Sequence, residues 1–373
     1  MNSSEDLGVA IGVTFLLLIA LGICFRSLFN SYDVISKIHL GAGIIHITSA
    51  LAIAWIVYTE SPVWEGRVMW ALYAWVPIGN YERLAGLPVT SNATNCDDGC
   101  MQYFYHKEAG SVPVALLAVL FGVVSGGVHV LSVVFDDEAF VDKVKMGKNT
   151  WRWVDYAISS SLMITVVAII VGVADVFVVV GVAASQFFLM IAAALLEEVM
   201  VSSSSGRISF YLTFLAYLVL VWMPIIASLH APEHSSEAAI PEWVYVVMYG
   251  LFAVYTCFAI VMWVYLVHNE PPRDVLERQS YFVRMDLKYV ALSLTSKLLL
   301  HWTLFNGILS RKNVLYHSLD EVQGDTSENN TLDAVIGAAV ASLVFGAIFY
   351  VVSWYVTKDT HGFKGDQIQL LTG

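Results

Sequence analysis

The sequence predicts an all-α membrane protein with nine transmembrane helices, and three observations support this fold class. First, 58% of the 373 residues are hydrophobic and only 13% are charged, with a mean hydropathy of +0.69. Soluble domains carry about 25% charged residues, so a chain of this composition is expected to fold in lipid. Second, apolar segments of membrane-spanning length recur along the chain. Third, lysine and arginine gather in every second connecting segment. The net charge of −12 excludes nucleic acid as a partner.

Nine apolar segments approach the length of about 20 residues that a helix needs to cross the bilayer core. They lie at residues 7–25, 36–58, 111–135, 151–173, 176–199, 207–230, 241–268, 284–309 and 333–356. The first has neither the basic start nor the cleavage site of a signal peptide, so we expect a retained helix. The fourth and fifth are separated only by the stretch around Gly172 and Asp175, which predicts a tight hairpin.

The distribution of basic residues predicts an extracellular N-terminus and a cytoplasmic C-terminus. In this orientation the cytoplasmic segments hold thirteen lysine and arginine residues and the external segments hold five, which is the bias that membrane insertion favours. Three N-x-S/T sequons also lie outside, at Asn2, Asn92 and Asn329, and are predicted glycosylation sites. We therefore expect a multi-pass protein of the plasma membrane or of an endomembrane.

Cys96 and Cys100 enclose two aspartates and a glycine in a polar external loop. A spacing this short suits either a metal ion or a disulfide bond. Because no second cysteine or histidine pair lies nearby to complete a zinc site, we favour a disulfide and expect no metal. The sequence also lacks GxSxG, HExxH and P-loop motifs, so we expect no enzymatic activity.

One lysine lies where a transmembrane helix should be apolar. Lys297 is near the middle of the eighth segment, and a charged group there costs roughly 2.5–3.5 kcal/mol on insertion. A carboxylate at similar depth would offset that cost, and Asp155 in the fourth segment is the candidate. The simplest interpretation is a structural ion pair. A lysine in an apolar site is also the residue that forms Schiff bases with aldehydes, and a carboxylate then acts as the counterion.

Two histidines lie at a depth similar to that of this pair. His46 in the second segment and His129 in the third fall in the same inner third of the membrane. Ser125 is four residues before His129, and Ser293 is four before Lys297, so each serine shares a helix face with its neighbour. A lone histidine is usually a hydrogen-bonded structural group. Histidines also titrate near neutral pH, and their convergence with the lysine predicts a buried proton-handling network.

The helices around Lys297 are rich in aromatic rings, which suit core packing, lipid contact or a flat polyene ligand. These rings belong to Trp222, Tyr249, Phe252, Tyr255, Phe258 and Trp302.

Several of these positions resemble the motifs of heliorhodopsins, the microbial rhodopsin family with inverted membrane orientation. The third helix of that family has an aromatic-rich stretch around a carboxylate, followed by serines and a methionine, and residues 152–163 are similar to it. The other matching residues are Ser293, Lys297 and Trp302 in the seventh family helix, Gly43 and His46 in the first, Ser125 and His129 in the second, and Asn149 six residues before Asp155. The resemblance covers residues 36–310, with a long external loop at 59–110.

The resemblance implies a seven-helix rhodopsin-like bundle at 36–310. The apolar segments in residues 1–35 and 311–373 depart from the family and add one helix at each end. It implies all-trans retinal as a Schiff base on Lys297, with Asp155 as counterion, and a homodimer that signals slowly to a cytoplasmic partner. The residues expected around the retinal are Ser160, Met163, Trp222, Tyr255, Ser293 and Trp302, and those expected in the proton network are His46, His129, Ser125 and Asn149. The family counterion is usually glutamate, so Asp155 is a departure, and Gln186 stands near a family asparagine.

A light-driven proton pump is disfavoured by two positions after the counterion. Pumps of the ordinary microbial type resemble one another in a threonine four residues later and a donor carboxylate eleven residues later. This chain has Ser159 and the apolar Val166 at these positions. Glu197 and Glu198 could begin a proton path, but a solvated helix end is the simpler interpretation of these two residues.

Three other functions compete with light sensing as interpretations of these residues. Light-gated proton conduction stays open. A nine-helix transporter without retinal, binding substrate or ions at Lys297 and Asp155, also stays open, although no convincing internal repeat supports it. A G-protein-coupled receptor is disfavoured by the short cytoplasmic loop at 201–206 and by the tight hairpin near 172–176.

Overall fold

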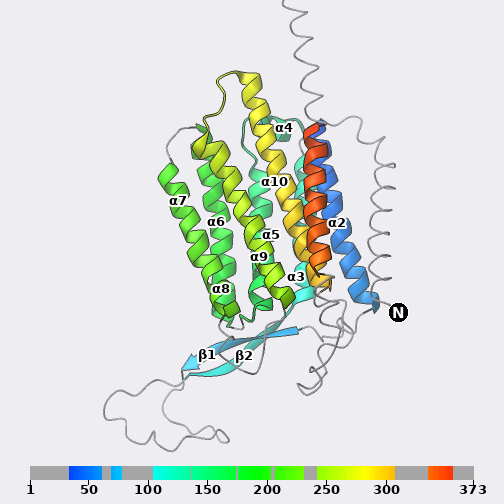
Figure 1. The fold of residues 1–373 in the computed structure, drawn as a ribbon, viewed down its shortest axis with the longest axis vertical. Coiled ribbons are helices and arrows are strands. Elements are labelled where there is room, and N and C mark those ends of the chain that lie inside the picture. The colour runs from blue at the N-terminus through cyan, green and yellow to red at the C-terminus, as the bar shows by residue number, and fades with distance from the viewer. Residues whose placement is uncertain are drawn as a thin grey trace, which may run out of the picture.

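The computed structural model describes residues 33–60, 69–77, 104–135, 137–173, 175–202, 206–230, 242–306 and 335–355. It is a nearly all-helical bundle whose long helices run side by side (Figure 1). The predicted helix at 7–25, the cysteines Cys96 and Cys100, and the sequons at Asn2, Asn92 and Asn329 lie outside the described residues. The predicted fold class, a helical membrane bundle, is confirmed.

The helices follow the predicted segments closely. In chain order they are α2 (Val34–Glu60), α3 (Val114–Phe135), the short α4 (Asp137–Lys145), α5 (Thr150–Ile170), α6 (Val176–Ser202), α7 (Arg207–Ala216), α8 (Met223–His230), α9 (Glu242–Met262) and α10 (Val275–Leu304). Two labelled π-helical turns extend this set: η3 (Tyr217–Trp222) joins α7 to α8, and η5 (Trp263–His268) continues α9. The described residues 305–306, directly after α10, are also π-helical. An unlabelled helix, Val335–Tyr355, follows α10.

Seven of the described helical segments are long and apolar enough to cross a membrane. They include Val335–Tyr355, the predicted additional helix after the core. The seven do not include α10, which carries Lys297 and Asp286. Nearly all residues of α10 from Phe282 to Leu304 are buried in the bundle, so its polar groups contact protein rather than lipid. The total of nine spans stays a prediction.

A hairpin of two antiparallel strands is the exception to the helical fold. Strand β1 (Met69–Pro77) pairs with β2 (Phe104–Pro113), from Met69 opposite Pro113 to Pro77 opposite Phe104, with a bulge after Leu72. This hairpin lies at one end of the bundle and α4 at the other (Figure 1). The sequence analysis expected only a loop at 59–110. The aromatic residues of β1 favour a strand, but apolar and polar residues do not alternate along it, so no strand was predicted.

Local signals explain where several helices begin and end. Asn149 caps α5 by accepting a hydrogen bond from the backbone nitrogen of Arg152, and Asp274 caps α10 in the same way. Gly172 has a φ of +93°, which glycine adopts without strain. Asp175 then accepts bonds from the first backbone nitrogens of α6. The tight hairpin predicted between these two spans is confirmed.

Two glycines bring α2 and α3 into close contact. A Cβ added at Gly126 would lie 2.7 Å from the carbonyl oxygen of Gly43 and 2.4 Å from a side-chain carbon of Ile47. Only glycine therefore fits at position 126, as in close helix pairs of membrane proteins. This contact determines how near the histidines of α2 come to His129 on α3.

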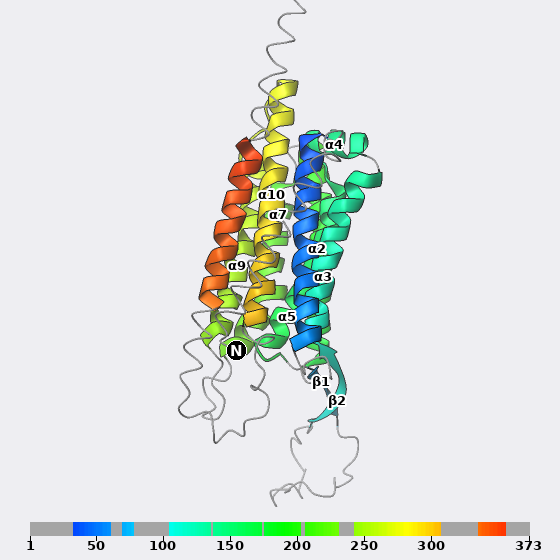
Figure 2. The ribbon, with the colours of Figure 1, turned by 90° about the vertical axis from the view of Figure 1, so that its right-hand side faces the viewer.

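The outer surface and the last helix complete the bundle. Large apolar side chains are exposed on the outer helices, as lipid contact requires, and examples are Leu51, Leu131, Phe188, Leu212, Ile260 and Val351. The helix Val335–Tyr355 runs beside α10 (Figure 2). Its Phe349 and Tyr350 pack against a cluster that contains Val283 and Val290 of α10.

Candidate functional site

The amine of Lys297 is the centre of a buried hydrogen-bonded group. Its Nζ donates to Asp155 Oδ2 at 2.8 Å, to Ser125 Oγ at 2.6 Å and to Ser293 Oγ at 2.8 Å. Ser125 also donates to Asp155 Oδ2 at 3.0 Å. Lys297 is 2% exposed and Asp155 is 1% exposed. The structure thus brings together a lysine, a carboxylate and two serines from α10, α5 and α3.

Burial makes this ion pair costly to break. Removing one charge would leave the other buried without its partner, which typically destabilises a protein by about 3–5 kcal/mol. Asp155 Oδ1 has no hydrogen-bond partner among the described residues. The carboxylate therefore keeps one free acceptor beside the amine.

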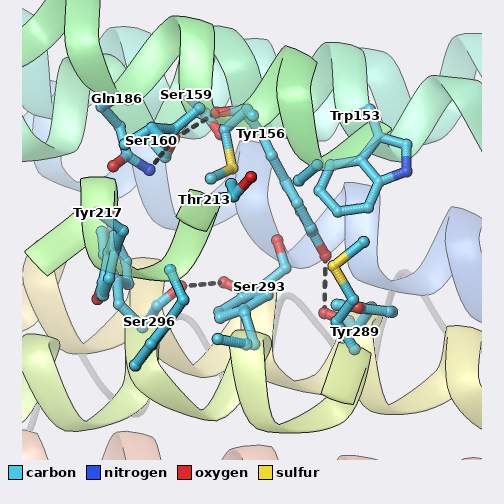
Figure 3. A pocket seen from close by; sticks show the side chains of 18 of the residues that line it. Trp153, Tyr156, Ser159, Ser160, Gln186, Thr213, Tyr217, Tyr289, Ser293 and Ser296 are labelled. Atoms are coloured by element: carbon cyan, nitrogen blue, oxygen red, sulfur yellow. Dashed lines mark hydrogen bonds between the residues drawn. The ribbon is translucent and has the colours of Figure 1, made fainter. Parts of the chain in front are cut away.

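A cavity begins at the Lys297 side chain and extends between α5, α6, α7, η3, α9 and α10. About 820 Å³ of it is empty space, part of which opens to the outside. Figure 3 shows that the labelled residues point into it from opposite walls. The aromatic and methionine side chains that line it are Trp153, Tyr156, Met163, Met190, Phe210, Phe214, Tyr217, Tyr255, Phe258, Met262 and Tyr289. Such a site suits an elongated apolar ligand.

A few polar groups interrupt the apolar wall. Ser159, Ser160 and Gln186 lie together on one side of the cavity (Figure 3). Gln186 Nε2 donates to Ser160 Oγ at 3.0 Å, whereas Ser159 Oγ and Gln186 Oε1 have no hydrogen-bond partner among the described residues. Buried polar atoms of this kind are usually satisfied, so these two are positioned to contact a ligand.

The residues predicted to surround the ligand divide into two groups. Ser160, Met163, Tyr255 and Ser293 line the cavity, and the hydroxyl of Tyr255 donates to the Met163 sulfur at 3.4 Å. Trp222 and Trp302 do not line it.

The two tryptophans pack elsewhere. Trp222 is fully buried behind the cavity wall, with its ring 6.0 Å from the Tyr255 ring. Trp302 packs near Ile53, Ala115 and Phe305 in a small core cluster.

The predicted histidines lie next to each other. The rings of His46 and His129 stack with centroids 5.7 Å apart and an interplanar angle of 17°. His46 is fully buried, and neither of its ring nitrogens has a hydrogen-bond partner among the described residues. His129 follows Ser125, which accepts a hydrogen bond from Lys297, by one helical turn on α3.

The hydrogen-bonded network extends further than the sequence analysis predicted. His39 Nδ1 lies 3.0 Å from His129 Nδ1, and His39 Nε2 lies 2.8 Å from Asp286 Oδ2. Asp286 Oδ1 accepts from Asn149 Nδ2 at 2.9 Å and from Arg152 at 2.6 Å. Asn149, predicted as a network member, therefore binds a carboxylate that the prediction omitted.

Helical spacing could have identified the missed residues. His39 is seven residues before His46, and Asp286 is eleven before Lys297, so each shares a face with a residue that was selected. Ionisable residues inside a membrane helix are functional candidates in general. Arg152 is one of the thirteen basic residues of the predicted cytoplasmic segments, but its side chain is buried.

The position of Glu197 differs from the predicted one. It was expected at a solvated helix end, but it is 2% exposed, and it accepts hydrogen bonds from Arg152 and from the indole nitrogen of Trp153. Its neighbour Glu198 forms an exposed ion pair with Lys148. Adjacent helix positions face different directions, which explains why one glutamate is buried and the other is not.

Val166 stands where ordinary proton pumps carry a donor carboxylate. Its apolar side chain is fully buried in the apolar core. Across the described residues, no group of three or more histidine, cysteine or acidic side chains is arranged to hold a metal ion.

The fold and the site together define a multi-pass helical membrane protein with a lysine–carboxylate pair beside a long aromatic cavity. Comparison with models of protein families identifies the family. The family model named Heliorhodopsin matches residues 70–309, which is more than half of the chain, so this protein belongs to the heliorhodopsin family. The match runs from β1 through α10 and excludes α2. No curated protein matches the chain. Membership implies a retinal-binding rhodopsin.

Proposed function

We propose that this heliorhodopsin is a light sensor that carries all-trans retinal as a Schiff base on Lys297, with Asp155 as the counterion. The observation that supports this best is the position of Lys297 Nζ, which is 2.8 Å from Asp155 and also lines the cavity. The amine can thus bond covalently to a ligand in the cavity while its proton stays next to a carboxylate.

The cavity residues fit such a chromophore. Aromatic rings and methionines pack well against a flat polyene, and the free Oδ1 of Asp155 offers a second acceptor beside the linkage. Retinal bound here supplies absorption of visible light and a change of shape that weakens the hold on the proton at Lys297. Ser125 and Ser293 orient that proton toward Asp155, and Tyr156 lies 5.4 Å from Nζ on the cavity side.

We infer signalling rather than pumping. Val166 stands where ordinary pumps carry a donor carboxylate, and an apolar side chain cannot return a proton to the lysine. His46 and His129 can hold the proton after it leaves Nζ, and a network of this kind shares it among several groups. We further propose that the protein is a homodimer, that its N-terminus is outside and its C-terminus cytoplasmic, and that a cytoplasmic partner detects the long-lived state.

Light-gated proton conduction is the second candidate. The observation in its favour is the chain of polar contacts that continues from His129 through His39 and Asp286 to Arg152 and Glu197. A current recorded under illumination at a fixed voltage would favour conduction, and its absence in protein that absorbs light would favour the sensor.

An absorption spectrum tests the proposed function directly. Purified protein with all-trans retinal is expected to show a visible band that Lys297→Ala abolishes. Lys288→Ala is the matched control, because Lys288 is on the same helix and lies over the Tyr265 ring, away from the cavity. Asp155→Asn is expected to shift the band to the red or to remove the protonated form. A visible band that survives Lys297→Ala would contradict the proposal.

A further inference from the structure

We propose that His39 is the middle member of a proton relay from His129 to Asp286, so that Asp286 Oδ2 is the final acceptor of a proton released at Lys297. This inference rests on the proposed function, in which light loosens that proton. It adds two residues that the sequence motifs do not include, and one of them, His39, also lies before the residues that the family model matches.

His39 lies between His129 and Asp286. His39 is the only described residue that contacts both His129 and Asp286 through ring nitrogens, with its Nδ1 3.0 Å from His129 Nδ1 and its Nε2 2.8 Å from Asp286 Oδ2. His39 is 3% exposed and Asp286 is 2% exposed. An imidazole that bonds through both nitrogens can accept a proton at one and release another at the other.

The ring contacts also determine where the protons sit at rest. Asp286 Oδ1 accepts from Arg152 and Asn149, and an acid in an ion pair with arginine stays a carboxylate. Oδ2 therefore accepts from His39, which places a hydrogen on His39 Nε2. Neutral His39 then has a lone pair at Nδ1, so His129 must carry its own hydrogen at Nδ1 and leave its Nε2 as an acceptor.

The alternative arrangement is less favourable. A doubly protonated His39 would donate to His129 Nδ1, and His129 would then carry its hydrogen at Nε2. No described residue accepts from His129 Nε2. A buried donor without a partner is rarer and more costly than a buried acceptor without one. The neutral arrangement leaves only a lone pair unsatisfied, and that lone pair can take a proton.

The charges of the buried groups favour proton transfer toward Asp286. Around Arg152 there are two buried carboxylates, Asp286 and Glu197, and the guanidinium bonds to both. With His39 neutral, this cluster has one negative charge in excess. By contrast, Lys297 and Asp155 balance each other. The excess negative charge makes this cluster a favourable place for a proton that leaves Lys297, in competition with Asp155, which is then left unpaired.

The transfer is balanced in atoms and charge. His129 Nε2 accepts the proton, His129 Nδ1 passes its hydrogen to His39 Nδ1, and His39 Nε2 passes its hydrogen to Asp286 Oδ2. Both histidines end neutral, each with its hydrogen on the opposite nitrogen. Asp286 ends as a neutral acid, and its ion pair with Arg152 is lost. The light signal is thereby converted into a change of charge at the α4 end of the bundle.

The resting arrangement is testable without retinal. Nitrogen NMR of ¹⁵N-histidine-labelled, retinal-free protein is expected to show His129 protonated at Nδ1 and His39 at Nε2, with signals assigned by their loss in His129→Gln and His39→Gln. A hydrogen on His129 Nε2, or a doubly protonated His39, would overturn the relay. This result does not depend on whether the protein absorbs light.

The transfer itself is testable by infrared difference spectroscopy under illumination. We expect a new carbonyl band of a protonated carboxylic acid that Asp286→Asn removes. His39→Gln preserves hydrogen-bonding groups but cannot pass a proton through a ring, so it should lose the band while retaining visible absorption. His301→Gln is the control, because buried His301 bonds to the Ala118 carbonyl and to Ser49 instead.

Each outcome has a distinct meaning. A full-sized Asp286 band in His39→Gln overturns the relay, and a wild-type spectrum without that band overturns Asp286 as the end point. A wild-type protein that forms no visible band contradicts the proposed function, and the NMR experiment then decides the relay alone.

Discussion

The two sides of Lys297 differ sharply in chemistry. On the side of α3 and α5 the amine donates to Ser125 and Asp155, and toward the α4 end a second hydrogen-bonded group runs from His129 through His39 to Asp286. On the side of α6, η3 and α9 the amine adjoins an aromatic cavity with few polar groups. The first side is suited to moving a proton and the second to holding an apolar ligand. One buried lysine can serve both only because it lies at their boundary.

The largest effect is expected from filling the cavity. Ala193 lines it, whereas its neighbour Ala192 does not. Ala193→Phe places a ring in the space that the retinal would occupy, so the visible band should be lost when all-trans retinal is added. Ala192→Phe should retain the band. Equal absorbance in the two variants would show that the ligand binds elsewhere.

The second largest effect is expected from removing the cation of the buried polar network. Arg152→Ala would leave Asp286 and Glu197 buried without their cation, which should lower the free energy of unfolding by about 3–5 kcal/mol. Unfolding in detergent followed by circular dichroism measures this. Lys148→Ala removes only an exposed partner of Glu198 and should cost about 1 kcal/mol or less. Similar losses in both variants would contradict the burial of the network.

A smaller effect on the same polar network is expected from a change at the contact between α2 and α3. Gly126→Ala introduces a methyl group against Ile47 and Gly43, and overpacking of this kind costs about 1–3 kcal/mol. It should also slow or weaken proton transfer, since it separates His39 from His129. Gly127→Ala meets nothing within 4 Å and should leave stability and transfer unchanged. Identical behaviour of the two variants would rule out the close contact.

The smallest expected effect is a change in the length of the counterion. Asp155→Glu adds one methylene and brings the carboxylate closer to Lys297 or forces it aside. We expect a shifted visible band of undiminished height, measured beside Asp155→Asn. A band that does not move at all would show that the carboxylate at 155 does not interact with the chromophore.

The sequence predicted residues that are related within one helix better than residues that meet across helices. Lys297, Ser293, Ser125 and His129 follow from spacings of four. Asp286 and His39 are separated by 247 positions, and no spacing rule connects them. Lys297 with Asp155 was predicted across helices only because each was unusual in an apolar segment.

Several residues lie in a different environment from the predicted one, because the sequence does not show how each helix is rotated about its axis. Trp222 and Trp302 lie on helices whose apolar residues occur on every face, so periodicity does not show which side meets the cavity. Glu197 and Glu198 were likewise indistinguishable in sequence. The β hairpin was missed because its first strand has no strict alternation and its partner begins 27 residues after the first strand ends.

The two labelled π-helical turns and the charged pair belong to different helices. Both η3 and η5 belong to helices that line the cavity, while the charged pair lies within regular α5 and α10, and π-helical residues follow α10 only at 305–306. A π turn closes wider backbone hydrogen-bond rings than an α turn and often marks a functional site. The charged pair is thus carried by regular α-helix, whereas the irregular turns belong to helices that a bound chromophore would meet on the other side of Lys297.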